Sequence, residues 1–232
     1  MRIGIISDIH GNSFAFKKVM ALLFNEADNI FFLGDLCGYY PFVEDCISIW
    51  ERNRITSICG NHDIILLECI ENGIGPGYEY EKKYGTGLTR ALRDLSPSSI
   101  SLLKSFPLSL KKEVNGISFN LYHGTPWDPL NGRIYPDYKD WERFQEVAGD
   151  VILLGHTHYP FFKRYKDKLI INPGSVGQPR DGISAASYAI FDIDSGEVKH
   201  RRVHYDPEII IDDAMKHDEN VPYLVEVLKR NG

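Results

Sequence analysis

The chain has 232 residues, of which 43% are hydrophobic and 25% charged, and its formal net charge is −6 at pH 7. These values are typical of a globular domain with a sizeable core, and the acidic balance excludes a protein that coats nucleic acid through a basic surface. The first residues, MRIGIISDIH, lack the features of a secretory signal, and no apolar run is long enough to span a membrane, so we expect a cytoplasmic protein.

Strand and helix patterns alternate in the first part of the chain. Short apolar runs predict strands at residues 2–7, 29–33 and 55–58. Helical spacing predicts helices at residues 13–24, with Ser13 as the N-cap, and at 44–51. This alternation favours a parallel sheet with right-handed crossovers.

Residues 71–87 hold five glycines and a proline, which indicates a loop or lid. Two helices are expected after it, at residues 88–95 and 97–105. Asn115-Gly116 then predicts a hairpin between strands at 108–114 and 117–122. A helix at 139–148 and further strands at 151–154, 160–166, 168–172, 185–193 and 197–203 follow, before two closing helices.

The expected fold class is therefore α/β, a four-layer α/β/β/α sandwich of two mixed sheets with flanking helices. Residues 1–232 would form one domain, with loop or lid insertions near 71–87 and 124–140. The four cysteines form no CxxC pair, and we expect reduced, buried thiols at Cys37, Cys46, Cys59 and Cys69.

Polar residues that can bind metals recur where the buried strands end. They are Asp8, His10, Asp35, Asn61, His62, His123, His156 and His158. Each cluster alone has an ordinary explanation as a cap or a turn, but five clusters in the same position are typical of a shared site at the carboxyl ends of the strands. In extended backbone, His156 and His158 would point to the same side.

The donor set consists of carboxylates, imidazoles and one amide, with no thiolate, which disfavours a structural zinc site. Such donors suit Mn, Fe, Zn, Co or Ni. Eight residues exceed one coordination sphere. Two ions about 3.5–4 Å apart, sharing one carboxylate, would use them, and this arrangement serves phosphoryl hydrolysis.

The motifs Asp8-Ile9-His10, Gly34-Asp35, Gly60-Asn61-His62-Asp63, His123 and Gly155-His156-Thr157-His158 resemble the ordered motif set of the calcineurin-like metallophosphoesterases. The segment NPGSVGQPRDG, residues 172–182, is similar to a branch of small prokaryotic predicted phosphodiesterases in that family.

The resemblance implies a role for each matching position. Asp8, His10, Asp35 and His158 would hold one divalent transition-metal ion, and Asp35, Asn61, His123 and His156 a second, with manganese favoured. A hydroxide between the ions would attack phosphorus in line. His62 would protonate the departing oxygen, and Asp63 would orient His62.

One departure from the family concerns the substrate. Serine/threonine protein phosphatases and symmetrical dinucleoside tetraphosphatases carry Asp and Arg after the second motif, where this chain reads Gly34-Asp35-Leu36-Cys37-Gly38-Tyr39-Tyr40. The missing arginine favours phosphodiesters or small nucleotides over phosphoproteins. Arg180 is a candidate replacement or a surface residue, and Asn12 is a candidate substrate contact or a helix cap.

The expected function is hydrolysis of phosphodiesters or small nucleotides, as small phosphate-ester substrates, by a dinuclear metal centre. The alternatives are a phosphomonoesterase, an asymmetrical dinucleoside polyphosphate hydrolase or a metal-binding scaffold without catalysis. Three aromatic residues in 124–140, Trp127, Tyr135 and Tyr138, form either a wall for a nucleobase or an apolar cluster beneath the loop. The sequence does not determine the oligomeric state.

Overall fold

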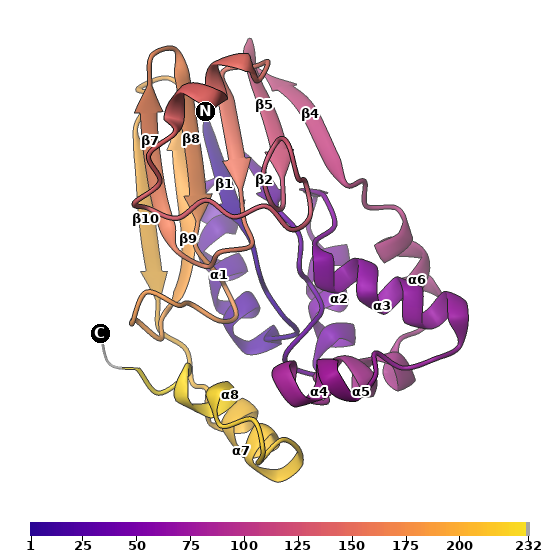
Figure 1. Ribbon diagram of the computed structural model, residues 1–232. Helices are drawn as coiled ribbons and strands as arrows, with labels where there is room; N and C mark the ends of the chain where they lie inside the picture. The colour runs from indigo at the N-terminus through magenta and orange to yellow at the C-terminus, as the bar shows by residue number, and fades with distance from the viewer. Residues whose placement is uncertain (231–232) are drawn as a thin grey trace.

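Two five-stranded sheets lie at the centre of the structure, a computed structural model that describes residues 1–230 (Figure 1). The first sheet contains, in spatial order, β10 (Val198–Val203), β9 (Ala186–Asp192), β1 (Arg2–Ile6), β2 (Asn29–Phe32) and β3 (Ile55–Ser57). The second contains β4 (Ser109–Val114), β5 (Ile117–Tyr122), β6 (Val151–Leu154), β8 (Lys168–Pro173) and β7 (Pro160–Tyr165). Both sheets are mixed. In the first, β1, β2 and β3 pair in parallel and β9 pairs antiparallel with both β1 and β10. In the second, the parallel strands β5, β6 and β8 are flanked by the antiparallel strands β4 and β7.

The helices cover the outside of the sheets and one end. They are α1 (Ser13–Glu26), α2 (Val43–Glu51), α3 (Asn61–Asn72), α4 (Tyr78–Tyr84), α5 (Gly87–Asp94), α6 (Pro97–Lys104), the 3-10 helix η1 (Trp141–Glu146), α7 (Glu208–His217) and α8 (Tyr223–Glu226). Among residues 1–230, none of the helices combines the length and the apolar character that crossing a bilayer requires.

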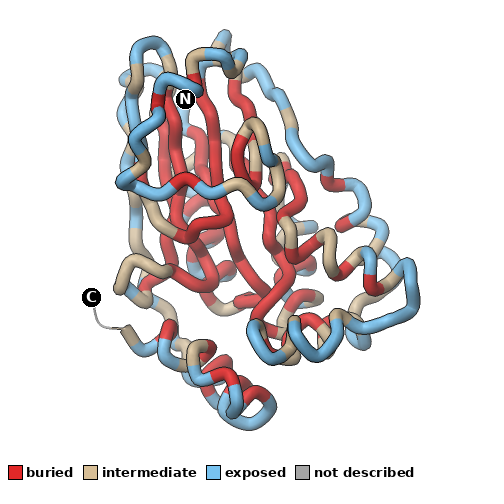
Figure 2. The backbone as a smooth tube through the Cα atoms, viewed as in Figure 1, coloured by how far each residue is buried: buried red, intermediate tan, exposed pale blue. Residues whose placement is uncertain are grey.

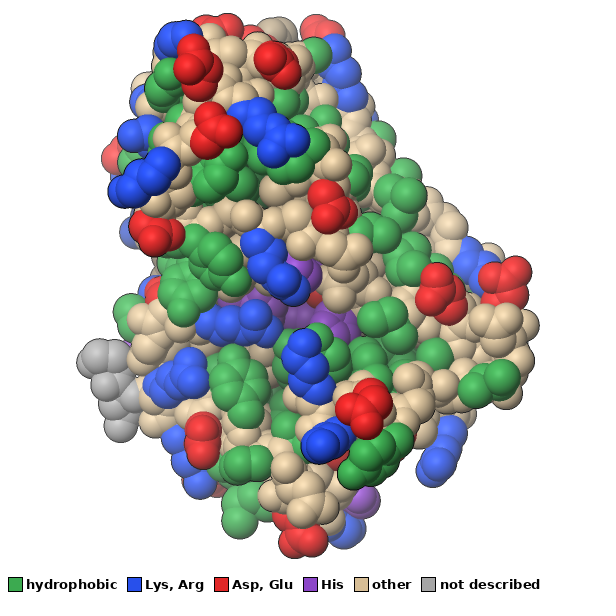
Figure 3. All heavy atoms as spheres, viewed as in Figure 1, with side chains coloured by type: hydrophobic (Ala, Val, Ile, Leu, Met, Phe, Trp, Pro, Cys, Tyr) green, Lys and Arg blue, Asp and Glu red, His purple; other side chains and the backbone are tan. Residues whose placement is uncertain are grey.

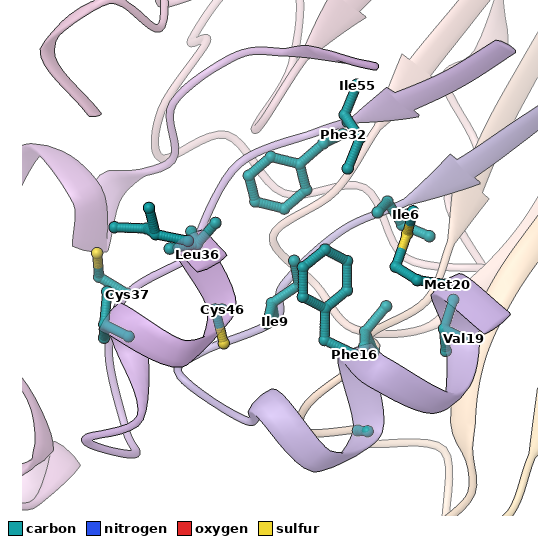
Figure 4. Close-up of a cluster of buried hydrophobic side chains, with 14 of the residues drawn as sticks. Ile6, Ile9, Phe16, Val19, Met20, Phe32, Leu36, Cys37, Cys46 and Ile55 are labelled. Carbon is teal, nitrogen blue, oxygen red and sulfur yellow. The ribbon is translucent and has the colours of Figure 1, made fainter. Parts of the chain in front are cut away.

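Successive side chains of the central strands point to opposite faces of the sheet and so contribute to two separate hydrophobic cores. Ile3 and Ile5 of β1 face the second sheet, where they pack with Phe119 and Leu153. Ile6 faces the other way, into the cluster between the first sheet and the helices that Figure 4 shows. Figure 2 shows the buried central strands inside an exposed periphery. This packing gives the strand ends a rigid support.

The outer layer of the second sheet is thinner than expected. The 3-10 helix η1 and the loop before it cover this face, with Trp141 and Phe144 packed on Ile152 and Ile170. The predicted fold class is confirmed, with a 3-10 helix where a longer α-helix was expected over residues 139–148.

Two local predictions were wrong. Asn12, not Ser13, is the N-cap of α1, because its side-chain oxygen accepts the backbone N–H of Ala15 at 3.0 Å. Residues 71–87 are not all loop, since α4 forms between Gly77 and Gly85. Its seven residues, YEYEKKY, carry no apolar period that would have predicted a helix. The four cysteines are buried and free, as expected.

Candidate metal centre

Five loops at the carboxyl ends of β1, β2, β3, β5 and β6 meet beside one cavity. The structure brings together every predicted donor residue there: Asp8, His10, Asp35, Asn61, His62, His123, His156 and His158. Six of these side chains come from loops, and the other two, Asn61 and His62, begin α3. The sheets therefore place the donors, and the loops orient them.

The donors form two adjoining groups in which the candidate ligand atoms lie within 4.8 Å of one another: Asp8, His10 and His158, and Asp35, His123 and His156. Asp35 joins the groups, since its Oδ2 lies 3.2 Å from His123 Nε2 and 3.9 Å from His10 Nε2. Asn61 Oδ1 lies 3.0 Å from His123 Nε2, which places the amide with the second group.

Three histidine rings have a fixed orientation. Nδ1 of His10, His158 and His123 each donates to a backbone carbonyl, at 2.9, 2.6 and 2.8 Å respectively. A histidine that donates through Nδ1 keeps a lone pair on Nε2, which is the form that binds metals. The fourth ring, His156, instead turns Nδ1 toward His123 Nε2 at 3.1 Å.

The first group fits a cation by its own chemistry. Nε2 of His10 and Nε2 of His158 lie 3.1 Å apart, although both are acceptors once the Nδ1 atoms donate. Asp8 Oδ1 is buried, has no hydrogen-bond partner among the described residues and lies 3.3 Å from His158 Nε2. Three lone-pair donors that converge without a proton between them are typical of a divalent metal site.

The backbone of the donors is strained. Seven non-glycine residues of the described chain have positive φ, and five of them are Asp8, His10, Asp35, His156 and His158, with φ between 52° and 64°. The expectation that His156 and His158 share an extended backbone was wrong, because both are left-handed. Strain of this kind is concentrated at functional sites.

The segment after β8 supports two of these loops. Asn172 Nδ2 donates to Gly155 O at 2.8 Å and to Thr157 Oγ1 at 3.1 Å, which braces the loop between the two histidines. Ser175 Oγ and Gly177 N both donate to Asp8 O, at 2.7 and 3.0 Å. The sequence NPGSVG thus braces the loops that carry the candidate donors Asp8, His156 and His158.

Asp63 does not orient His62, contrary to the expectation. Its Oδ2 accepts the backbone N–H groups of Asp35 and Gly60, and its Oδ1 accepts that of Cys37, each at 2.9 Å. Both oxygens are committed to the loop that presents Asp35. The ring of His62 bonds instead to Tyr80 of α4, with Nδ1 2.5 Å from the tyrosine oxygen.

Asn12 also has a structural role. Besides capping α1, its amide donates to Gly177 O at 2.9 Å and to Tyr205 Oη at 2.8 Å, and the side chain is fully buried. The capping interpretation therefore holds, and in this structure Asn12 presents no free group to a substrate.

The charges of the site are closely coupled. Burial alone would lower the pKa of His123, but the Asp35 carboxylate raises it to about 9. Burial lowers the pKa of His62 to about 4 and that of His156 to about 3. Burial and the neighbouring Asp35 raise the pKa of Asp63 to about 6. The metal-free site therefore keeps most of its histidines neutral at pH 7, as metal binding requires.

A cavity of about 510 Å³ opens over the donors. It is also lined by the cations Lys83, Arg133 and Arg180 and the tyrosines Tyr39, Tyr84, Tyr135 and Tyr223. Figure 3 shows histidine atoms at the floor of this hollow with Lys and Arg side chains around it. Among the residues that line it, Asp35 is the single carboxylate.

Arg180 borders this cavity and is not an exposed surface residue. Its Nη2 donates to Tyr39 Oη at 2.7 Å, and its Nε is buried without a partner among the described residues. The aromatic residues of 124–140 divide between the two interpretations: Tyr135 lines the cavity, whereas Trp127 and Tyr138 pack with Phe144 beneath the loop.

Four lining residues were not predicted from the sequence: Lys83, Tyr84, Arg133 and Tyr223. Arg133 lies in the loop that directly follows His123, and this adjacency was the one available signal. The other three come from α4 and α8, which reach the cavity only through tertiary packing.

Comparisons with known proteins agree with this geometry. The sequence profile of the calcineurin-like phosphoesterase superfamily domain matches residues 1–196. An uncharacterized protein of Methanocaldococcus jannaschii is 34% identical over 222 residues, which is 88% of each chain.

Two solved structures are similar over nearly their whole length. A metallophosphoesterase from Sphaerobacter thermophilus is 28% identical, with a TM-score of 0.79 and 99% of each chain covered. A hypothetical protein from Pyrococcus horikoshii is 20% identical, with a TM-score of 0.81 over 100% of this chain and 98% of that one, and this likeness shows the fold. The chain belongs to the calcineurin-like phosphoesterase superfamily and is a metal-dependent phosphoester hydrolase.

Proposed function

We propose that this protein is a dinuclear metallophosphoesterase that hydrolyses phosphodiesters or small nucleotides. The observation that carries the proposal is the pair of adjoining donor groups joined at Asp35. When bound, two divalent ions activate a water molecule as the nucleophile and neutralise the charge that develops on phosphorus.

Each donor has a proposed role. Asp8, His10 and His158 would hold one ion, His123, His156 and Asn61 would hold the other, and Asp35 would serve both. The oxygen and nitrogen donors suit Mn, Fe, Zn, Co or Ni, and we favour manganese because carboxylate and carbonyl oxygens are among the ligands. Asp63 supports the Asp35 loop through three backbone hydrogen bonds.

His62 is the proposed general acid. It lines the cavity, and one of its ring nitrogens lies within 4.8 Å of ligand atoms of His10 and Asp35. Burial holds its pKa at about 4. A bound phosphate ester brings negative charge to the ring, and a nearby opposite charge raises the pKa of a histidine. Protonation of His62 then accompanies substrate binding, and the proton passes to the departing oxygen.

The cationic and aromatic residues that line the cavity support a nucleotide substrate. Lys83, Arg133 and Arg180 provide positive charge for phosphate groups. The tyrosines, among them Tyr84 and Tyr135, offer faces on which a base stacks. A volume of about 510 Å³ is within the range of small-ligand sites.

Two alternative activities would use the same metal centre. A phosphomonoesterase or an asymmetrical dinucleoside polyphosphate hydrolase would need only a different fit against the cavity wall. The extra cations favour a substrate with more than one phosphate over a simple monoester. A non-catalytic scaffold is disfavoured, because every donor and the candidate acid His62 are present together.

A substrate panel tests the proposal. The metal-free protein is reconstituted with Mn, Fe, Zn, Co or Ni ions and assayed on a nitrophenyl diester, a nitrophenyl monoester, a cyclic nucleotide and a dinucleoside polyphosphate. We expect the highest kcat/KM on a nucleotide or diester, and Arg180→Gln to raise KM for nucleotides more than for the nitrophenyl diester. A preference for the monoester in every metal form would contradict the substrate assignment.

A further inference from the structure

The ring of His62 is enclosed by tyrosines. Tyr39, Tyr80 and Tyr84 lie with their ring centroids 5.3, 5.6 and 4.9 Å from that of His62. Only Tyr80 makes a hydrogen bond to the ring among residues 1–230, with its oxygen 2.5 Å from Nδ1. The contact comes from α4, a helix outside the five metal-binding motifs.

Among the described residues, no carboxylate makes a hydrogen bond to the ring of His62. Asp63 uses both oxygens on backbone N–H groups, and Asp35 accepts the backbone N–H of His62 at 2.8 Å rather than the ring. Gly38 lies beside the ring, but a Cβ there would be 2.6 Å from His10 Nδ1, so no side chain fits. A tyrosine hydroxyl is the one available orienting group.

The protonated form of His62 defines the direction of its hydrogen bond with Tyr80. Burial raises the pKa of Tyr80 far above its ordinary value, so the side chain stays a neutral phenol. Both ring nitrogens of a protonated histidine are donors, so in the acid form of His62 the phenol oxygen accepts Nδ1–H. The other ring nitrogen, Nε2, makes no hydrogen bond within the described residues and is left to meet a substrate.

We propose that Tyr80 is the positioning residue of His62: its hydroxyl accepts Nδ1–H and directs Nε2–H at the departing oxygen. This rests on the proposed function, in which His62 is the acid. Water adds to phosphorus and releases one proton to solvent, the P–O bond breaks with its electron pair on the leaving oxygen, and the Nε2 proton of the protonated ring moves to that oxygen. His62 is left as the neutral Nδ1–H form and regains its proton from solvent.

Helix α4, which carries Tyr80, is anchored by hydrogen bonds to α5 and to the end of α7. Thr89 of α5 donates its hydroxyl to Glu81 at 2.6 Å, and Thr86, just after α4, donates its backbone N–H to Asp218 Oδ1 at 2.6 Å. These bonds fix the position of α4 against α5 and the end of α7. The phenol is therefore held in place before substrate binds, as positioning requires.

Two matched diesters test the proposal. Bis(p-nitrophenyl) phosphate releases a stabilised anion that needs little protonation, whereas diphenyl phosphate releases a basic phenolate that needs an acid. We expect Tyr80→Phe to lower kcat on diphenyl phosphate by about 10-fold or more, while kcat on the nitrophenyl diester and the metal content stay unchanged. Tyr78→Phe is the control, because Tyr78 lies on the same helix and is 73% exposed.

A double variant separates positioning from a structural effect. If Tyr80 acts through His62, then Tyr80→Phe added to His62→Gln lowers kcat on diphenyl phosphate no further than His62→Gln alone. Equal losses of Tyr80→Phe on both diesters, or additive losses in the double variant, would overturn the proposal. If His62→Gln itself affects both diesters equally, the acid role fails, and that result identifies the proposed function as the error.

Discussion

At the scale of single residues, the donors are held in backbone conformations that their side chains disfavour. A left-handed non-glycine residue costs about 1–2 kcal/mol, and Asp8, His10 and Asp35 all adopt this conformation. Hydrogen bonds between the loops offset the cost, since Asp8 N donates to Gly34 O and His10 N to Asp35 O, each at 3.0 Å. The fold therefore fixes the site before any metal binds.

The shifted pKa values of three site histidines predict that the stability of the metal-free protein is highest at one intermediate pH. The pKa values of His62 and His156 are lowered to about 4 and 3, so below pH 6.5 the unfolded chain binds more protons and stability falls with acidification. The pKa of His123 is raised to about 9, so between 6.5 and 9 the folded chain binds more protons and stability falls as pH rises. We expect the highest Tm of the EDTA-treated protein near pH 6.5.

The control for this titration is His123→Asn. It removes the raised group, so the decline in Tm on the alkaline side should become shallower, while the decline on the acid side remains. Thermal melts across the pH range provide the measurement. A Tm that climbs steadily from pH 6.5 to 9 in the metal-free protein would show that the Asp35–His123 pair is not charged as described.

At the scale of elements, the features that depend on the position of a strand could be predicted from the sequence, whereas those that depend on tertiary packing could not. The donors at the carboxyl ends of the strands could be predicted, because parallel strands must bring their ends to one edge. Helix α4 could not, since its seven residues lie between glycines and show no apolar period. Its role depends on the distant contact of Tyr80 with His62.

The roles of Asp63 and Asn12 were unpredictable for a related reason. Both residue types cap and brace loops as readily as they contact substrates or histidines, and only the hydrogen-bond partners distinguish these roles. In the structure Asp63 accepts backbone N–H groups and Asn12 caps α1. The motif positions were informative about proximity to the site, not about function within it.

The cap of α1 gives a prediction at this scale. Asn12→Ala removes the capping oxygen and the two hydrogen bonds of the amide, so the free energy of unfolding should fall by about 2–3 kcal/mol. Asn12→Ser keeps a capping oxygen without burying a charge and should lose less. Urea denaturation measures both. Unchanged stability together with a raised KM would instead identify Asn12 as a substrate contact.

At the scale of the whole molecule, charge is distributed unevenly. The chain has a net charge of −6, yet the wall of the cavity carries Lys83, Arg133 and Arg180. A basic cleft on an acidic protein draws small anions to one place and repels polyanions from the rest of the surface. This distribution agrees with a small phosphate ester as the substrate and argues against a protein that coats nucleic acid.

The central claim is that two ions share Asp35 and together perform hydrolysis. The most direct measurement is a titration of the metal-free protein with Mn²⁺, in which bound metal and the hydrolysis of bis(p-nitrophenyl) phosphate are followed together for the natural chain and for Asp35→Ala. We predict two ions per chain, activity that appears with the second, and at least about 100-fold less activity in Asp35→Ala. Full activity with one ion per chain, or metal-dependent hydrolysis retained in Asp35→Ala, would contradict it.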